Sequence, residues 1–140
     1  MRRLLLVATL LLLVATRLAQ APLFAHHAFA SEFDADKQVH LKGAITKMQW
    51  INPHGWLYID AVEIDGKPVP NGQPVPWALE FGSPVRLMQS GWRKDDLPVG
   101  KIVTVEAYRA KNGTNTANAN KVVLPDGKEL FAGSSLGDRN

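Results

Sequence analysis

Four histidines offer the widest choice of chemistry in this 140-residue sequence: His26, His27, His40 and His54. If the chain is cleaved after Ala25, His26 carries a free α-amine beside its own imidazole, and both nitrogens can chelate one metal ion. Copper(II) prefers such nitrogen ligands among the first-row divalent ions. A second imidazole would complete the site. We consider His54 first because it lies in a turn with proline, and His27 or His40 are the alternatives. A copper(II) site at His26, His54 and His27 is therefore a hypothesis that the sequence raises, and ordinary solvated histidines are the alternative.

Large aromatic side chains are a second group of residues that could form a binding site. The chain has 4 Trp and 2 Tyr residues. Trp50 and Trp56 bracket Asn52, so this loop carries an aromatic ring on each side and can hold a ligand ring or a sugar. The alternative is that the rings fill the core, as aromatic side chains commonly do. Trp50, Asn52 and Trp56 are therefore the candidate ligand-binding residues.

Known enzyme signatures do not fit the sequence. The chain has 0 Cys, which excludes disulfides, thiol catalysis and Cys-ligated metal centres. The carboxylates of residues 32–36 lack the glycine and distal glutamate of a calcium-binding loop. Residues 133–137 match G-x-S-x-G, but too little chain follows the serine to form the helix of a nucleophile elbow. We therefore expect a non-catalytic binding or accessory module of unknown ligand, with no catalytic and no cofactor-binding residues. A copper(II)-binding protein is the alternative, and a small enzyme is the third possibility.

The first 25 residues have the pattern of a secretory signal peptide. Arg2 and Arg3 precede an apolar run from Leu4 to Val14, which is too short to span a bilayer. Cleavage can follow Ala21 or Ala25. We favour Ala25 because proline would follow the other cut. The sequence thus predicts export to the periplasm or the medium, with no membrane span after processing; an uncleaved anchor is the alternative.

Processing changes the charge of the chain. The precursor has a net charge of +3, from 16 Lys and Arg against 13 Asp and Glu. Residues 1–25 contain three arginines and no acid, so the mature chain is neutral. Nucleic-acid binding loses its electrostatic basis. We expect one domain over residues 26–135, a flexible tail over residues 136–140, and a small ligand or a protein as partner.

The hydrophobic pattern predicts a mainly-β fold. The lead-in over residues 26–38 is expected to be extended. The alternation in residues 39–50 slips in phase between Gly43 and Lys47, which indicates a bulge. Proline-rich residues 67–76 and polar residues 111–120 are expected to be loops. The expected strands are residues 39–50, 56–64, 77–81, 102–108, 121–124 and 128–131.

A single short helix is expected between the third and fourth strands. Ser83 can cap its first turn, Pro84 suits its first position, and Gly91 can end it. Three strands, a helix and two further strands are the element order of the OB barrel. We therefore expect a small OB-like antiparallel barrel of five to six strands, with a β-sandwich as the alternative.

Several short motifs run along the mature chain. They are His26-His27-Ala28-Phe29-Ala30-Ser31-Glu32-Phe33-Asp34, Leu41-Lys42-Gly43, Asn52-Pro53-His54, Trp77-Ala78-Leu79-Glu80, Gly91-Trp92, Val105-Glu106, Tyr108-Arg109-Ala110-Lys111, Asn115-Thr116-Ala117-Asn118-Ala119, Leu124-Pro125-Asp126-Gly127 and Leu130-Phe131-Ala132-Gly133. Together they resemble a family of small exported bacterial proteins, domain of unknown function family 6152. This chain departs from it at Gly55 and in a longer loop over residues 66–76. The resemblance implies export and a compact β domain, and it carries no reaction and no catalytic residue.

Overall fold

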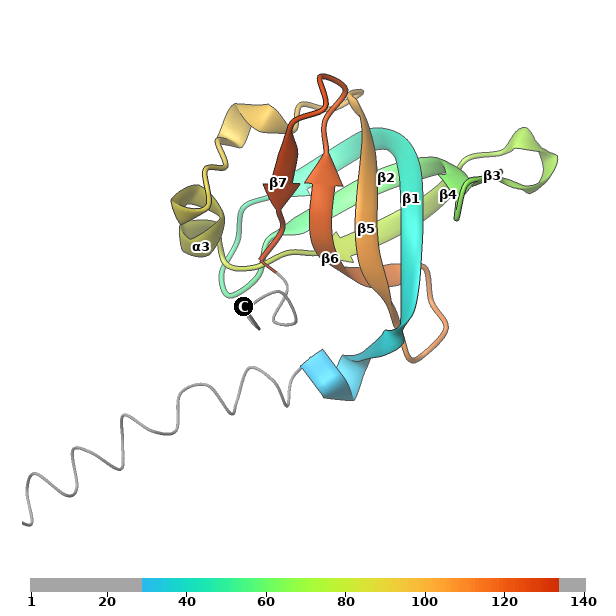
Figure 1. The fold of residues 1–140 in the computed structure, drawn as a ribbon, viewed down its shortest axis with the longest axis horizontal. Helices are drawn as coiled ribbons and strands as arrows, with labels where there is room; N and C mark the ends of the chain where they lie inside the picture. Colours follow the sequence, from blue (N-terminus) through green and yellow to red (C-terminus); the bar gives the residue numbers. More distant parts are fainter. Residues whose placement is uncertain (1–28, 134–140) are drawn as a thin grey trace, which may run out of the picture. The chain divides into compact units, whose positions relative to one another are not determined.

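The computed structural model describes residues 29–133 (Figure 1). Contacts divide the chain into an N-terminal unit, Met1–Ser31, and a second unit, Glu32–Asn140, which contains the fold discussed below. The described part of the second unit is built from seven strands and short helical turns. The strands are β1 (Phe33–Gln49), β2 (Trp56–Ile64), β3 (Lys67–Pro68), β4 (Val75–Glu80), β5 (Ile102–Ala110), β6 (Thr116–Val123) and β7 (Glu129–Phe131).

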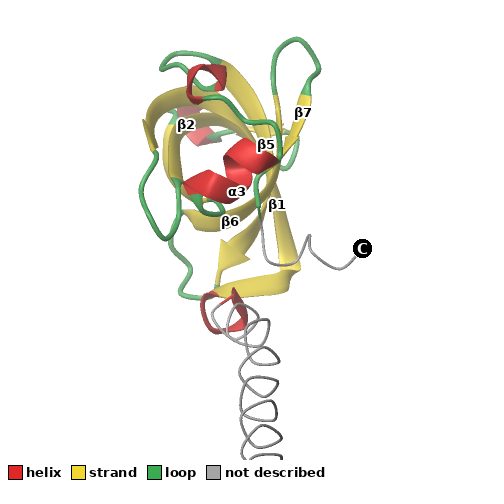
Figure 2. Cartoon of the chain, turned by 90° about the vertical axis from the view of Figure 1, so that its left-hand side faces the viewer, coloured by secondary structure: helices red, strands yellow, loops and turns green. Residues whose placement is uncertain are grey.

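Five of these strands close into a ring. The hydrogen-bonded order is β1-β5-β6-β4-β2, and β2 pairs again with β1. All of these pairs are antiparallel except β4 with β6, which is parallel. The ring curves around the core in Figure 2. The expected mainly-β fold, with an OB-like order of three ring strands, a helix and two ring strands, is confirmed; β3 and β7 extend the sheet.

The inside of the ring is filled by alternate side chains of each strand. In β2, Leu57, Ile59 and Ala61 are buried, and the residues between them are partly exposed. A strand sends successive side chains to opposite faces, so this pattern fixes which face lines the core. The outward faces of β2, β4, β5 and β6 are therefore the surfaces available for a binding site.

The long strand β1 pairs with β2 on one side and with β5 on the other, and bulges interrupt its pairing with β2. Its register against β2 shifts between Lys42 and Gly43, and again between Ile45 and Lys47. The phase slip predicted from the sequence is confirmed at this position. A Cβ atom added to Gly43 would lie 2.7 Å from the Cα atom of Ala61, so a side chain does not fit where the strands cross.

The helix α3 (Pro84–Gln89) closes one end of the ring, as predicted between the third and fourth ring strands. The Ser83 hydroxyl accepts a hydrogen bond from the Arg86 backbone N–H at 3.4 Å. Leu87 is fully buried and belongs to the core cluster of the ring. Gly91 follows the helix with a φ of 92°, as expected of a residue that ends a helix.

Three expectations about local structure are wrong. The lead-in is not simply extended, because residues 29–32 are helical and β1 begins at Phe33. Residues 116–120 are not loop but belong to β6, whose backbone pairs with both β4 and β5. The proline-rich segment contains β3 and a 3₁₀ turn, Pro70–Gly72, and a second such turn covers Lys94–Asp96. Between residues 29 and 133, no helix is long and apolar enough to cross a membrane.

Candidate functional site

Strand register places four side chains in one line across the outer face of the ring. Trp56 of β2 lies opposite Glu80 of β4, and Glu80 lies opposite Asn118 of β6. Asn118 in turn lies opposite Tyr108 of β5. Residues directly opposite each other on adjacent strands share a face and have neighbouring side chains. We call Trp56, Glu80, Asn118 and Tyr108 the outer row.

Glu80 is the centre of this arrangement. Its side chain is only 13% exposed, and its Oε1 atom lies 3.4 Å from Nδ1 of His54. The Asn118 side-chain amide donates a hydrogen bond to the same Oε1 atom at 3.3 Å. Burial raises the pKa of Glu80 above its usual value, the nearby negative charge of Glu32 adds to that rise, and His54 and Asn118 oppose it. The site is therefore a desolvated carboxylate with few compensating charges.

His54 is held against this carboxylate by the backbone. Its Nδ1–H donates to the carbonyl oxygen of Phe81 at 3.2 Å. Two backbone bonds fix the turn: Gly55 N donates to Gly82 O at 3.1 Å, and Phe81 N donates to Gly55 O at 2.8 Å. Because Nδ1 is engaged, Nε2 is the ring nitrogen that can meet a ligand, a metal ion or a proton.

Asn118 is the buried polar side chain of the described chain, with 6% exposure. Its Nδ2 group is bonded to Glu80, but its Oδ1 atom has no hydrogen-bond partner among the described residues. Leaving a buried acceptor unpaired costs about 1–3 kcal/mol. The Oδ1 atom is closed to solvent, so a donor from outside the fold would pair with it only after a neighbouring side chain moves.

The structure separates the residues that the sequence singled out. Trp56 belongs to the outer row, and Asn52 is exposed in the turn before it. Trp50 packs against the core, in line with the core-filling alternative. His40 lies on β1, opposite Glu106 of β5. The backbone N–H of His40 donates a hydrogen bond to the Asp65 side chain at 2.9 Å.

One of the three proposed copper ligands, His54, lies among the described residues. His54 joins Glu80, whereas His26 and His27 lie outside the described residues. Within residues 29–133, no three His, Asp or Glu side chains are grouped so that they could hold a metal ion. Any metal site that uses His54 would therefore need ligands from elsewhere.

Sequence reasoning missed Glu80, Asn118 and Tyr108 as site residues. The alternation in residues 77–81 did place Glu80 outward, but Asn118 lay in a segment expected to be a loop. Only the parallel pairing of β4 with β6 brings these side chains together, and no local pattern encodes that pairing.

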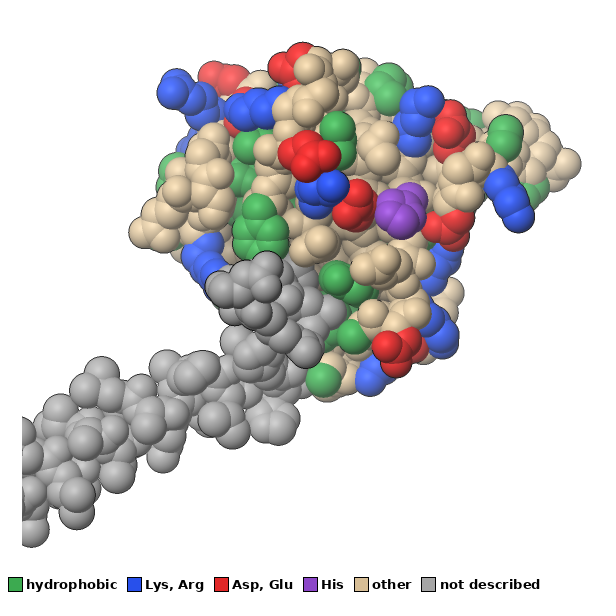
Figure 3. All heavy atoms as spheres, in the orientation of Figure 1, with side chains coloured by type: hydrophobic (Ala, Val, Ile, Leu, Met, Phe, Trp, Pro, Cys, Tyr) green, Lys and Arg blue, Asp and Glu red, His purple; other side chains and the backbone are tan. Residues whose placement is uncertain are grey.

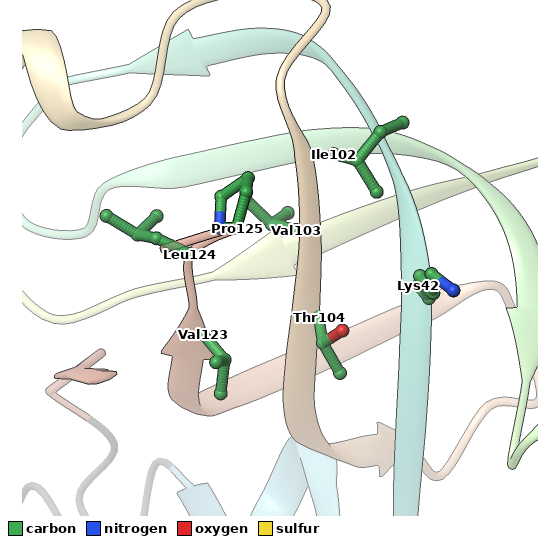
Figure 4. A pocket seen from close by; sticks show the side chains of 7 residues that line it. All are labelled: Lys42, Ile102, Val103, Thr104, Val123, Leu124 and Pro125. Atoms are coloured by element: carbon green, nitrogen blue, oxygen red, sulfur yellow. The ribbon is translucent and has the colours of Figure 1, made fainter. Parts of the chain in front are cut away.

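A hollow lies where β1, β5 and the turn after β6 meet. It encloses about 240 Å³ and is mostly apolar (Figure 4). The Lys42 ammonium at its edge pairs with Glu63 at 2.8 Å. Its lining residues are Lys42, Ile102, Val103, Thr104, Val123, Leu124 and Pro125.

Charges of both signs alternate on the face shown in Figure 3. Lys121 lies 2.9 Å from Glu106 and 3.3 Å from Glu129, so one lysine serves two carboxylates there.

Comparison with known proteins gives a family and no activity. The model of a family of unknown function, DUF6152, matches residues 13–119. This span contains the outer row and His54, and it ends before the motifs at residues 124–133. No curated protein matches the chain. Since the match covers most of the sequence, the chain belongs to the DUF6152 family of proteins of unknown function.

Proposed function

We propose that this protein is a small, exported, non-catalytic binding module that takes a small polar ligand at the outer row, beside His54. The observation that carries the proposal is Asn118, a buried side chain with an unpaired acceptor next to a desolvated carboxylate. A fold gains nothing from an unpaired buried acceptor. A ligand N–H or O–H group would supply the missing bond once a neighbouring side chain moves to uncover the Oδ1 atom.

The aromatic neighbour supports binding rather than mere imperfect packing. Trp56 lies directly opposite Glu80 and is only partly buried. Binding sites typically combine apolar or aromatic surface with a few convergent polar groups. Trp56, Glu80, Asn118 and His54 provide that combination on rigid strands and a backbone-held turn.

The N-terminal sequence supports export. Two arginines, a short apolar run and small residues before Ala25 are the features that secretory signal peptides share. The mature chain would have no net charge, which favours a small ligand or a protein over nucleic acid as partner.

The proposal is tested by NMR titration of the purified, isotope-labelled protein with a panel of small amines, polyols and amino acids. We expect at least one compound to shift the side-chain amide signals of Asn118 and the indole signal of Trp56. Trp56→Leu should weaken that binding, and Glu129→Gln on the exposed strand β7 should not. If every binder shifts signals only outside the outer row, the proposed site is wrong.

A copper(II)-binding role is the second candidate, and one observation favours it. The Nδ1–H group of His54 is held by the Phe81 carbonyl and by Glu80. Histidines that bind a metal through one nitrogen commonly donate the other N–H to a carbonyl or a carboxylate. His26 and His27 would supply the remaining ligands in this proposal.

A further inference from the structure

We infer that the ligand of the outer row is an organic cation, a primary alkylammonium group such as the end of a diamine or of a lysine side chain. This inference rests on the proposed function and specifies its ligand. The polar groups at the centre of the site are acceptors: the Glu80 carboxylate and, beside it, the buried Asn118 Oδ1 atom. An ammonium group has three N–H donors and no acceptor, so it matches such a set.

The acceptors that remain for a ligand can be named atom by atom. His54 and Asn118 both contact the Oε1 atom of Glu80, which leaves Oε2. Asn118 Oδ1 belongs to the amide group that bonds to Glu80, so the two acceptors are close together.

Glu80 differs from several other acids of the described surface in having no Lys or Arg partner. Glu63, Glu106 and Asp65 pair with Lys42, Lys121 and Arg109 at 2.8, 2.9 and 3.2 Å. Glu80 is less exposed than any of these acids, yet within the described chain its ion-pair partner is a histidine and not a Lys or Arg.

Electrostatics around Glu80 favour a cation from outside. A mostly buried carboxylate without a strong cation is costly, and the charge of Glu32 increases that cost. A bound ammonium group would neutralise it.

Trp56 supplies the face that an ammonium or its methylene chain needs. Cations within about 6 Å of an aromatic ring are attracted by the ring face. The described residues make such contacts themselves, with Lys47 Nζ 5.5 Å from the centre of the Tyr58 ring and Arg109 5.2 Å from that of Trp77. Among the described residues, Trp56 has no such cation, and it lies opposite Glu80.

Two other ligand classes fit less well. A neutral polyol carries acceptors as well as donors, and the site gives its hydroxyl oxygens few donors in return. A metal ion would need more ligating side chains than the described residues group together. A cation with N–H donors uses every feature of the site.

The test uses putrescine and its neutral counterpart butane-1,4-diol, titrated in amine-free phosphate buffer and followed by NMR. We expect putrescine to shift Asn118 and Trp56 signals, and the diol not to bind measurably. Glu80→Gln should weaken putrescine binding about ten-fold or more, because it removes the charge but keeps the shape. Trp56→Leu should weaken it as well, which covers the case in which the first variant does not fold.

The control is Glu129→Gln, which also removes a carboxylate, but one that contacts Lys121 and whose side chain is 60% exposed. It should change putrescine binding less than about two-fold. If the diol, or any neutral compound of the panel, binds the outer row and putrescine does not, the cation inference is overturned and the binding site stands. If no compound shifts the outer row, both proposals fail.

Discussion

Replacing Glu80 by Gln should make the free protein more stable at neutral pH. The glutamine oxygen can still accept from His54 and Asn118, so the existing contacts at 3.4 and 3.3 Å are retained. The new amide N–H can donate to Asn118 Oδ1, and one such bond contributes about 1 kcal/mol. The lost attraction to His54, whose side chain is 49% exposed, offsets at most about 1 kcal/mol.

Removal of the desolvated Glu80 charge should add to the stability of the variant. Together these effects predict a net gain of about 1 kcal/mol in the free energy of unfolding. For a domain of this size that corresponds to a rise in Tm of about 4 °C. Urea denaturation and thermal melts of both proteins at pH 7 measure the difference. Glu129→Gln is the control and should remain within about 0.5 kcal/mol of the wild type.

The stability difference between Glu80→Gln and the wild type should grow as the pH rises. The pKa of Glu80 is raised by burial in the folded state, so folding favours the protonated form. The wild type should therefore lose stability as the pH rises through that raised pKa, whereas the glutamine variant has no group there to titrate. The advantage of Glu80→Gln should be largest at neutral pH and shrink in acid. An advantage that is constant with pH, or a variant less stable at pH 7, would refute the reasoning.

Three further predictions concern the fold, the copper hypothesis and processing. Gly43→Ala should destabilise the domain by about 1–3 kcal/mol, measured by urea denaturation, because its Cβ would lie 2.7 Å from Ala61 Cα. Copper(II) titrated into processed protein should bind one-to-one, and one extra residue before His26 should weaken that binding sharply, with His54→Ala weakening it less; equal binding by the extended chain would exclude the amine as a ligand. Intact mass of the exported protein should show a chain beginning at His26, and one beginning at Pro22 would contradict the cleavage after Ala25.

The ring strands with strong alternation could be predicted from the sequence, and the weakly patterned ones could not. The second and fourth ring strands, Trp56–Ile64 and Ile102–Ala110, were expected nearly as they occur. The start of β6 was not, since Thr116 to Asn120 reads as a polar turn. Those residues are strand because neighbouring backbones bond to them on both sides and because Ala117 and Ala119 fit the crowded interior. Tertiary pairing overrides local propensity there.

The candidate site was less predictable than the fold. His54 and Trp56 stood out because histidine and tryptophan are chemically distinctive and bracket a turn. Glu80 and Asn118 are 38 residues apart and come together by register alone. A shift of that register by one residue would turn Asn118 inward and remove the site, so its existence depends on the packing of Ala117 and Ala119.

The free protein keeps at Glu80 a group that its own fold does not need. Glutamine would preserve the hydrogen bonds to His54 and Asn118 and remove a carboxylate that burial and Glu32 both disfavour. Groups that are unfavourable for stability and set in rigid surroundings are common at binding sites, because a preorganised charge is worth most to a ligand. Stability of Glu80→Gln and its affinity for putrescine should therefore move in opposite directions. Two changes in the same direction would mean that the carboxylate serves the fold.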